Sequence, residues 1–320
     1  MTLTDAERRT PVGALWALLA VVCFSTNDVL VKFLSSGYPL YQLMFIRTLF
    51  AMAFILAVLV PMTGGLGALR TRRLVTHLIR GLCVVFANFC FFLGLAALPL
   101  AEAVAIFFIS PLAVSVFAVV FLGETVGPRR WAAIAFGLLG VIIVLRPGTE
   151  AFQVAALMPL LAALGYATLH TMTRRIGTTE NATAMAFYIQ VSFVLVSGVA
   201  GIAFGNGQFE TFDHPSMEFL FRAWVWPAGF DLALIALLGV TSALGGFSIS
   251  NAYRRSEAAY VAPFEYAAMP LAVVWGLAVF GEWPDLFAWL GIALILASGL
   301  VLIWRETVAN NRARVAPKRL

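Results

Sequence analysis

The sequence predicts an all-α polytopic membrane protein with ten transmembrane helices, and three observations lead to this fold class. Of the 320 residues, 62% are hydrophobic and only 12% are charged, whereas a soluble domain carries about 25% charged residues. Ten apolar runs approach or exceed the roughly 20 residues that a helix needs to cross a bilayer. The basic residues concentrate in alternate links between these runs, which is typical of a fixed membrane topology.

The ten runs are joined mostly by very short links. "SSGY", "PLA" and "GEWP" leave room only for tight helical hairpins, whereas residues 205–229 form one long link. The first run follows an acidic N-terminus without a cleavage site, so we expect it to be retained as a helix. The expected spans are residues 12–34, 38–60, 74–97, 100–122, 129–146, 152–173, 183–204, 230–252, 257–280 and 284–305.

The distribution of basic residues predicts that both termini are cytoplasmic. If the chain starts inside, the inner segments hold 17 of the 21 basic residues, and the outer links hold Lys32, Arg146 and Arg222. This asymmetry is the positive-inside pattern of a bacterial-type inner membrane protein. Because the basic residues are scattered singly and in pairs, they do not indicate a nucleic-acid partner. The basic tail "ANNRARVAPKRL" is expected to be disordered.

The two halves of the chain, residues 1–150 and 151–320, carry similar segments in the same order. Residues 12–34 and 154–176 are identical at seven of 23 positions without a gap. "FLGETVGPRRW" is matched by "VFGEWPDLFAW", and "PLAVSVFAVV" by "PLAVVWGLAV". Because each half has five predicted helices, an odd number, the second copy enters the membrane from the opposite side. We therefore expect an inverted 5+5 repeat, which is typical of alternating-access transporters.

The segment "AEAVAIFFISPLAVSVFAVVFLGETVGPRRWAAIAFGLLGVIIVLRPG" and its counterpart in the second half resemble the EamA unit of the drug/metabolite transporter (DMT) superfamily. Members of this superfamily move amino acids, nucleotide derivatives, vitamins and toxic cations. The size and layout are similar to those of the YddG-type aromatic amino acid exporters, and also to those of S-adenosylmethionine uptake carriers. The resemblance implies a central cavity lined by the first, third, fourth, sixth, eighth and ninth helices.

Polar residues in the first run raise the question of a site within the membrane. Asn27, Asp28 and Lys32 lie in an otherwise apolar helix, where a charge costs about 2.5–3.5 kcal/mol. Asp28 and Lys32 are four residues apart, so a local ion pair is one interpretation. The alternative is that Asn27 and Asp28 face a water-filled path, with Lys32 near the outer interface as a topology anchor.

Arg47 is the deepest basic residue, nine residues into the second run, or about 13 Å from the outer end. A guanidinium at this depth needs a partner. Asp28 on the preceding helix is the candidate for a structural ion pair. The alternative is that Arg47 binds a carboxylate of the substrate.

Glu265 is the second predicted intramembrane carboxylate, in "YVAPFEYAAMP" between Pro263 and Pro270. A proline frees the carbonyl four residues before it, here including that of Tyr266. Irregular backbone at membrane depth is tolerated where it lines a cavity or is buried in protein. Together with Tyr260 and Tyr266, this segment could hold a cation or an aromatic amino acid. The alternative is a buried, protonated carboxyl that serves packing.

Four further residues are candidates for substrate or proton contacts. His170 takes the place of Asp28 in the internal alignment, and histidine titrates near neutral pH, although His170 could instead meet interfacial water. Asn88 either clamps two helices together or contacts the ligand. The remaining candidates are Tyr166 in the sixth run and Ser110, which precedes the helix-breaking Pro111 in the fourth.

These features predict a secondary-active, alternating-access exporter of small organic metabolites, most notably amino acids, including aromatic ones, and toxic organic cations. An uptake carrier for S-adenosylmethionine is the alternative within this class, and an intramembrane enzyme is the alternative outside it. The sequence contains no phosphate-binding loop or metal-ligand cluster, so we expect no cofactor and no metal. The expected partners are a small-molecule substrate and the lipid bilayer, and a homodimer is left open.

Overall fold

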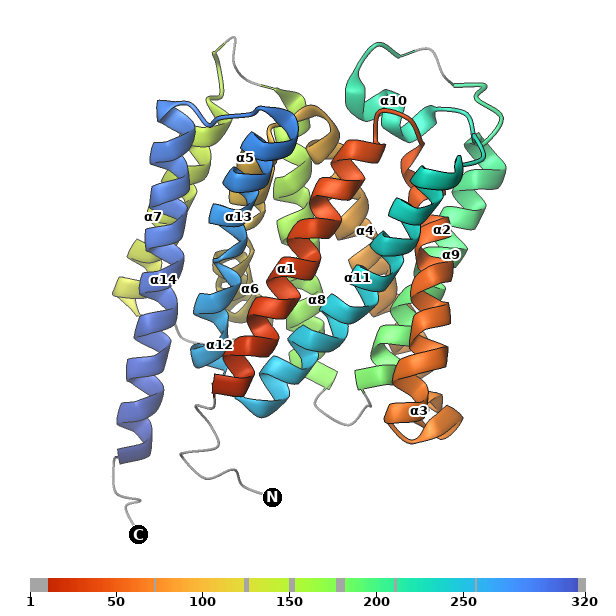
Figure 1. Cartoon of the computed structure of the whole chain (residues 1–320). Coiled ribbons are helices and arrows are strands. Elements are labelled where there is room, and N and C mark those ends of the chain that lie inside the picture. Colours follow the sequence, from red (N-terminus) through yellow and green to blue (C-terminus); the bar gives the residue numbers. More distant parts are fainter. Residues whose placement is uncertain are drawn as a thin grey trace.

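A computed structural model of the chain describes residues 11–71, 73–123, 127–149, 153–176, 182–209, 212–256 and 258–315. Within the helices some side chains, among them those of His170 and Tyr260, lie outside the described part. The described residues form helices and their connections, and the helices stand side by side in one bundle (Figure 1).

The described part of the N-terminal half contains five helical segments. Three are unbroken: α1 (Pro11–Leu34), α4 (Leu74–Ala97) and α7 (Pro128–Leu145). The second segment consists of α2 (Leu40–Phe54), a π-helical stretch (Ile55–Leu59) and α3 (Val60–Met62), and a 3₁₀ helix (Gly65–Leu69) follows it. The fourth segment consists of α5 (Leu100–Phe107) and α6 (Ser110–Leu122).

The described part of the C-terminal half also contains five long helical segments and one short surface helix, α10 (Pro215–Phe221). A 3₁₀ turn (Val154–Ala156) leads into α8 (Leu157–Ile176), and α9 (Ala182–Phe204) and α11 (Gly229–Arg255) follow. The ninth segment consists of α12 (Ala258–Glu265), α13 (Ala268–Trp275) and a π-helical stretch (Gly276–Phe280), and the last is α14 (Leu286–Val315).

Each predicted apolar run coincides with one of these helical segments to within a few residues, except at the C-terminus. Among the described residues, seven helices are long and apolar enough to cross a membrane. Three shorter apolar helices accompany them: Trp131–Leu145, Val154–Leu169 and Leu286–Leu302. The prediction of an all-helical, polytopic protein is therefore confirmed, whereas the count of ten crossings stays a prediction.

The prediction of a disordered C-terminal tail is wrong for the described residues after the last apolar run. α14 continues as a helix to Val315, ten residues past the predicted end of the span. The sequence of this extension contains neither glycine nor proline before Pro317, and alanine, arginine and glutamate are good helix formers. The helix ends close to that proline, as is usual. Residues 316–320 lie outside the described part.

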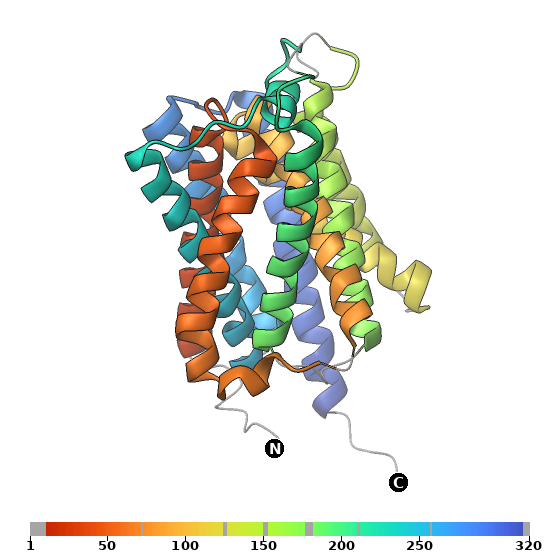
Figure 2. The same ribbon diagram turned by 90° about the vertical axis from the view of Figure 1, so that its right-hand side faces the viewer.

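Helix packing follows the same pattern in both halves. α1 packs on α11, and the corresponding helices α8 and α4 pack on each other. α2 packs on α11 just as α9 packs on α4, and the corresponding pairs α2 and α9, and α7 and α14, are also in contact. Figure 2 shows α9 beside α2. Exchange of the two halves would reproduce this set of contacts.

The first helices of the two halves run in opposite directions. In Figure 1, α1 begins at the lower end of the bundle, where α14 finishes, whereas α8 begins at the upper end. Both halves also stop a helix with a glycine in the left-handed region, Gly123 (φ 69°) after α6 and Gly281 (φ 66°) before α14. The glycine of the repeated "GE" therefore has the same backbone role in each copy.

Glycines bring helices together where the backbones cross. A Cβ atom on Gly239 of α11 would lie 2.5 Å from the backbone oxygen of Arg47 in α2. A Cβ on Gly291 of α14 would lie 2.7 Å from the backbone oxygen of Gly140 in α7. Small residues are favoured at such crossings in membranes because packing, rather than hydrophobic burial, drives the association of helices.

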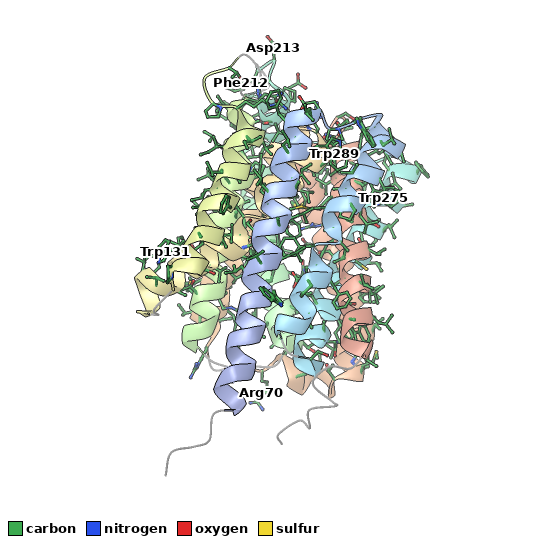
Figure 3. All side chains as sticks on the ribbon, turned by 90° about the vertical axis from the view of Figure 1, so that its left-hand side faces the viewer. Arg70, Trp131, Phe212, Asp213, Trp275 and Trp289 are labelled. Carbon is green, nitrogen blue, oxygen red and sulfur yellow. The ribbon has the colours of Figure 1, made fainter. Side chains whose placement is uncertain are left out.

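The outer surface of the bundle suits a bilayer. Large apolar side chains such as Ile202 (89% exposed) and Leu15 (64%) project from it. Figure 3 places Arg70 at the end of the bundle where α14 finishes, and Asp213 at the opposite end. Trp289 lies towards the end that holds Asp213, where tryptophan favours the membrane–water interface.

Candidate functional site

A polar cluster in the bundle joins helices of both halves. Arg47 on α2 is 2% exposed, and its Nη1 atom donates a hydrogen bond to Oδ1 of Asn27 on α1 at 3.1 Å. The Asn27 Nδ2 atom donates to the backbone oxygen of Leu238 at 3.0 Å and to Oγ1 of Thr241 at 3.3 Å, both on α11. The amide of Asn27 is thereby held in one orientation, with its oxygen towards the arginine.

Two aromatic rings face the guanidinium of Arg47. Its Cζ atom lies 5.7 Å from the ring centre of Phe92 on α4 and 5.1 Å from that of Phe193 on α9. Cation–π contacts of this kind stabilise a desolvated arginine. The Nε atom of Arg47 has no hydrogen-bond partner. A buried charge usually has all its donors paired, so this cation is only partly satisfied by the protein.

The predicted ion pair between Arg47 and Asp28 is not formed. No hydrogen bond and no ion pair within 4.0 Å joins them in the described part, although each lies within electrostatic range of the other. The Nη1 atom of Arg47 instead donates to the neutral oxygen of Asn27, the residue next to Asp28 on α1. Asp28 is partly buried on α1, so a carboxylate and a guanidinium lie near each other without neutralising each other directly.

The predicted local pair between Asp28 and Lys32 is also not formed. Lys32 instead lies 2.7 Å from Oε1 of Glu282, which precedes α14. Its side chain is only 10% exposed, and its role as a topology anchor stays a prediction. The long lysine side chain extends towards the end of α1, where Glu282 offers a closer acid than the same-helix carboxylate.

A continuous aromatic array leads from Arg47 to the ninth helical segment. It consists of side chains on α4, α5, α8 and the link between α12 and α13, together with Phe108 at the end of α5. Its ring-to-ring contacts are Phe92–Phe91 at 5.6 Å, Phe91–Phe107 at 5.2 Å, Phe107–Tyr166 at 5.5 Å, Phe107–Phe108 at 6.4 Å and Phe108–Tyr266 at 5.0 Å. Such an array presents ring faces and edges that suit a planar aromatic ligand.

Glu265 lies at the far end of the aromatic array from Arg47. It is partly buried and lies within electrostatic range of Tyr166 and Tyr266. Tyr266 itself is 5% exposed, and its hydroxyl oxygen has no hydrogen-bond partner. The array is therefore bounded by a carboxylate at one end and by a guanidinium at the other.

The two helix breaks meet at this array. α5 gives way to α6 at Phe108 and Ile109, and α12 gives way to α13 at Tyr266 and Ala267, so each break carries one ring of the Phe108–Tyr266 contact. Short helical stretches interrupted inside a bundle are typical of substrate sites in transporters with repeats.

The prolines have different roles in these two segments. Pro111 lies in the first turn of α6 and Pro270 near the start of α13, just after each break, whereas Pro263 lies inside α12. The prediction that the Tyr266 carbonyl is freed is wrong, because the Met269 N–H donates to it at 3.1 Å. Pro270 has no N–H to donate to this carbonyl, as residue i+4 would in an α-helix. The donor is instead residue i+3, Met269, as in a 3₁₀ turn.

The other predicted residues are distributed unevenly. Asn88 donates to the Val84 carbonyl of its own helix at 3.1 Å, so the predicted helix–helix clamp is wrong. Its helical spacing puts it on the same face of α4 as Phe91 and Phe92. Ser110 is 4% exposed at the start of α6. The side chains of His170 and Tyr260 lie outside the described part.

Sequence reasoning missed three parts of the site: the aromatic array as such, Thr241 as a partner of Asn27, and Gln190. Gln190 on α9 is 6% exposed with an unpartnered Oε1 atom, and it lies one turn from Phe193. For Gln190, the only signal in the sequence was a polar amide side chain within an otherwise apolar run. The 27 phenylalanines of the chain gave no means of choosing those that face Arg47.

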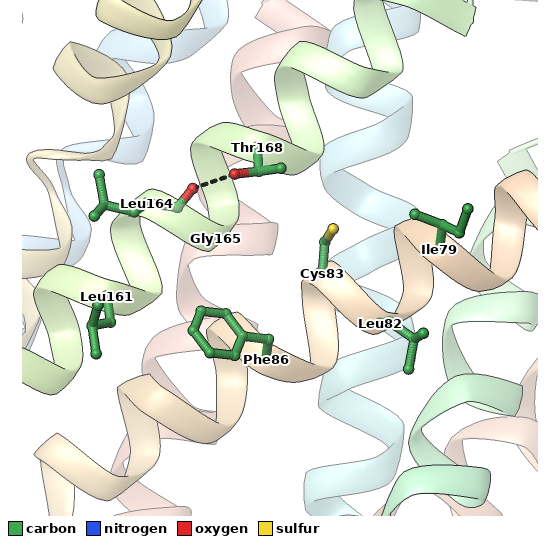
Figure 4. Close-up of a pocket in the computed structure, with 8 residues that line it drawn as sticks. All are labelled: Ile79, Leu82, Cys83, Phe86, Leu161, Leu164, Gly165 and Thr168. Atoms are coloured by element: carbon green, nitrogen blue, oxygen red, sulfur yellow. Dashed lines mark hydrogen bonds between the residues drawn. The ribbon is translucent and has the colours of Figure 1, made fainter.

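A groove between α4 and α8 is separate from this site. Figure 4 shows its lining, which consists of Ile79, Leu82, Cys83, Phe86, Leu161, Leu164, Gly165 and Thr168. Leu164 and Thr168 lie two residues on either side of Tyr166, about 200° round the helix, so the groove faces away from the array. The Thr168 hydroxyl donates to the Leu164 carbonyl at 2.9 Å, so it does not expose an unpaired hydroxyl to hydrocarbon.

A bundle of apolar helices with a charged and aromatic interior defines a multi-pass membrane transporter. Residues 11–146 match the EamA-like transporter family, and a relative that is 33% identical over 95% of this chain extends the likeness beyond them. The chain belongs to the EamA-like transporter family of the DMT superfamily. It is therefore a multi-pass protein of the bacterial inner membrane, and a transporter rather than an enzyme.

Three relatives illustrate the range of substrates. A riboflavin transporter of Rhizobium johnstonii is 33% identical over 307 residues, which cover 95% of each chain. An S-adenosylmethionine uptake transporter of Rickettsia felis is 28% identical over 312 residues, covering 97% of this chain and 98% of the relative. A pseudopaline exporter of Pseudomonas aeruginosa is 26% identical over 293 residues, covering 91% of this chain and 93% of the relative.

A solved structure, titled only as the crystal structure of a protein, superposes with a TM-score of 0.62 at 20% identity. The superposition covers 94% of this chain and 98% of the other. At this level of identity the likeness shows the fold alone. The three relatives named above differ in substrate and in direction of transport, so family membership establishes transport without establishing what is carried.

Proposed function

We propose that the protein is a secondary-active carrier in which two inverted five-helix repeats, residues 1–150 and 151–320, alternate access to a central site. The exchange symmetry of the helix contacts supports this proposal, as do the opposite directions of α1 and α8 (Figure 1). In this arrangement the ten helical segments cross the membrane, both termini are cytoplasmic, and one half rocks against the other.

The proposed substrate is a small metabolite with a planar heteroaromatic ring, and riboflavin is the first compound to test. The aromatic array between Arg47 and Glu265 is the observation that carries this proposal, because stacked and edge-on rings select for planarity. The guanidinium adds hydrogen-bond donors that suit the carbonyl groups of a polar ring system. Riboflavin and S-adenosylmethionine, the cargo named for two relatives, both contain such a ring.

Export of aromatic amino acids, the expectation from the sequence, remains the second candidate. The specific observation in its favour is the opposite charge at the two ends of the array. Arg47 can bind a carboxylate and Glu265 an ammonium group, while the rings hold the aromatic side chain. The same argument extends to organic cations, for which Glu265 and Tyr266 supply the negative end.

Three titratable residues are proposed to carry the coupling proton, if a proton gradient drives transport. Asp28 lies beside Arg47, Glu265 lies beside the tyrosines, and His170 takes the place of Asp28 in the internal alignment. The further proposed contacts of the substrate are Asn27, Asn88, Ser110, Tyr166, Tyr260 and Tyr266. The breaks after Phe107 and Glu265, with Pro111 and Pro270 beside them, supply the irregular backbone that transporter sites use.

A counterflow screen tests the proposal directly. Purified protein in proteoliposomes is loaded with unlabelled riboflavin, S-adenosylmethionine, tryptophan or a quaternary ammonium compound, and the uptake of the labelled form of each is followed at two pH gradients. We expect riboflavin to give saturable counterflow that Phe107→Ala and Tyr166→Ala weaken. Counterflow of tryptophan alone would replace the first candidate by the second, and counterflow of none of the four would overturn both.

A further inference from the structure

A network of charged residues joins the two halves at the end of the bundle where α1 finishes and α14 begins (Figure 1). The Lys32 Nζ atom lies 2.7 Å from Oε1 of Glu282, and the two side chains are 10% and 27% exposed. Lys32 belongs to the N-terminal half and Glu282 to the C-terminal half. This ion pair therefore crosses the boundary along which the two halves would have to move.

Both charged groups of this pair are also bound to backbone atoms of a third element. The second carboxylate oxygen of Glu282 accepts a hydrogen bond from the N–H of Leu100, the first residue of α5, at 2.9 Å. The Lys32 ammonium donates to the carbonyl of Leu98. The link between α4 and α5 thus supplies one donor to the acid and one acceptor to the base, which fixes the geometry of the pair.

A second ion pair also joins a cation of the N-terminal half to an acid of the C-terminal half. The Arg146 guanidinium, at the end of α7, pairs with Asp285, which immediately precedes α14. Arg146 has φ 48°, the left-handed region that side chains rarely adopt. Asp285 also accepts a hydrogen bond from the Ala288 N–H at 2.9 Å. In both pairs the cation comes from residues 1–150 and the acid from residues 151–320.

Glu102 completes the network. It lies within electrostatic range of both cations and of both acids, so three carboxylates face two cations at this end. The excess acid makes each cation harder to remove, because an unpaired carboxylate would remain in a partly buried place. By contrast, the third ion pair in the described part, Arg222 with Glu218 at 3.1 Å, lies within one half around α10.

We propose that the bond between Lys32 and Glu282 is the latch that closes the candidate site from this end of the bundle. The inference rests on the proposed rocking of the halves, because a bond between them restrains access only if they separate. α1 carries Asn27 and Asp28 less than two turns from Lys32, and α5 carries Phe107 two turns from Leu100. Release of the latch would therefore free the helices that carry the Arg47 end and the middle of the aromatic array.

The labelling rate of a reporter cysteine at the candidate site measures whether the latch is closed. Asn88 is replaced by cysteine in a background where Cys23, Cys83 and Cys90 are serine, because residue 88 shares its helix face with Phe91 and Phe92. A membrane-impermeant maleimide is applied to oriented vesicles from the Lys32 side. We expect Lys32→Gln and Glu282→Gln each to raise the rate of labelling roughly fivefold, a typical factor for coupling between conformational states.

Three further variants make the outcome specific. The exchange Lys32→Glu with Glu282→Lys should return labelling only part of the way to the parent rate, because the attraction is rebuilt while the backbone groups of Leu98 and Leu100 no longer match the exchanged side chains. Lys32→Arg should stay near the parent rate. Gln208→Ala, which removes the hydrogen bond from Gln208 to the Ala203 carbonyl within one half, should leave labelling unchanged. Unchanged labelling in both single variants, or acceleration by Lys32→Arg as large as that by Lys32→Gln, would overturn the latch.

The labelling assay separates this inference from the proposed function. It requires neither a known substrate nor transport, and a folded variant is recognised by its monodisperse elution in detergent. If Lys32→Gln changes the labelling rate but no compound gives counterflow, the latch is supported and the proposed substrates are rejected. If riboflavin gives saturable counterflow but Lys32→Gln does not change the labelling rate, the substrate is supported and the latch is rejected.

Discussion

Arg47 and Lys32 are two buried cations of the N-terminal half, and they are satisfied in different ways. Lys32 has a carboxylate at 2.7 Å and a backbone oxygen, so its charge is neutralised within the protein. Arg47 has a neutral amide oxygen, two aromatic rings and an unpartnered Nε atom. A charge that is paired serves the architecture, whereas one without an acid in contact can still attract a ligand. This difference separates the proposed latch from the proposed binding site.

The largest expected effect follows from replacement of Arg47. Arg47→Gln removes the uncompensated charge, and we expect kcat/KM for the substrate to fall by about 100-fold, equivalent to ~3 kcal/mol. Arg47→Lys keeps the charge but loses the planar group and should retain part of the activity. Transport assays with equal amounts of reconstituted protein provide the measurement. If Arg47→Gln transported normally, Arg47 would be structural and the contrast with Lys32 would disappear.

The next effect concerns the backbone that positions Arg47. Gly239→Ala would place a Cβ atom 2.5 Å from the Arg47 backbone oxygen, and we expect it to lower stability by about 1–3 kcal/mol. Gly246→Ala on the same helix is the matched control, because a Cβ there has no neighbour within 4 Å and alanine favours helix. Thermal unfolding in detergent measures both. Equal midpoints for the two variants would contradict the close approach of α2 and α11.

The two carboxylates of the site sharpen the comparison further. Asp28→Asn and Glu265→Gln should each reduce transport by about tenfold, or ~1.4 kcal/mol, with expression unchanged. Asp28→Asn should alter the pH dependence of transport if Asp28 carries a proton, whereas Glu265→Gln should mainly raise KM for a cationic or ammonium-bearing substrate. Normal transport by both variants would remove the acids from the proposed site.

The internal repeat predicts a counterpart to the latch at the opposite end. The alignments of the two halves match Lys32 with Arg174 and Glu282 with Glu124; the side chains of Arg174 and Glu124 lie outside the described part. If the halves are related by inversion, Arg174→Gln should slow labelling of the cysteine at position 88 from the Lys32 side, by roughly fivefold or less. Acceleration by this variant would contradict the inverted relation.

The smallest expected effect is the pH dependence of the second ion pair. The hydrogen bond from Arg146, together with that from the Ala288 N–H, holds the pKa of the Asp285 carboxyl below its usual value. A lowered pKa means that this stabilisation is complete above the usual pKa of about 3.9 and is lost as the pH falls through the lowered value. Asp285→Asn should therefore lower the unfolding midpoint at pH 7, and the difference between the two proteins should shrink as the pH falls below 4. A constant difference between the two proteins from pH 3 to 8 would rule out this contribution.

The positions of the helices were predictable because the signal is distributed over whole segments. Each apolar run of about 20 residues carries its own evidence, and an error of two residues at an end does not change the assignment. The end of α14 was not predictable in this way, because helix propensity beyond the apolar run competes with the polarity that suggests disorder. The breaks were foreseen from Pro111 and Pro270, since proline acts locally, but the break predicted at Pro263 is wrong, because α12 continues through this residue.

The partners of the charged residues were not predictable, because each depends on which helices are neighbours. Asp28 was expected to pair with Arg47 or Lys32 on grounds of spacing, yet a neutral amide binds the arginine and an acid 250 residues away binds the lysine. Residues that are far apart in the sequence become neighbours when the second half packs against the first. The same applies to the aromatic array, whose six rings come from four separate helical segments.

The fixed orientation of Asn27 has a consequence for selectivity over evolutionary time. Because its nitrogen is committed to α11, position 27 can offer Arg47 only an uncharged oxygen. An aspartate there would supply the missing negative charge from within and make the arginine indifferent to the cargo. If Arg47 binds the cargo as proposed, a single-base change from an asparagine to an aspartate codon would neutralise it and weaken its attraction for a negatively charged group of the substrate.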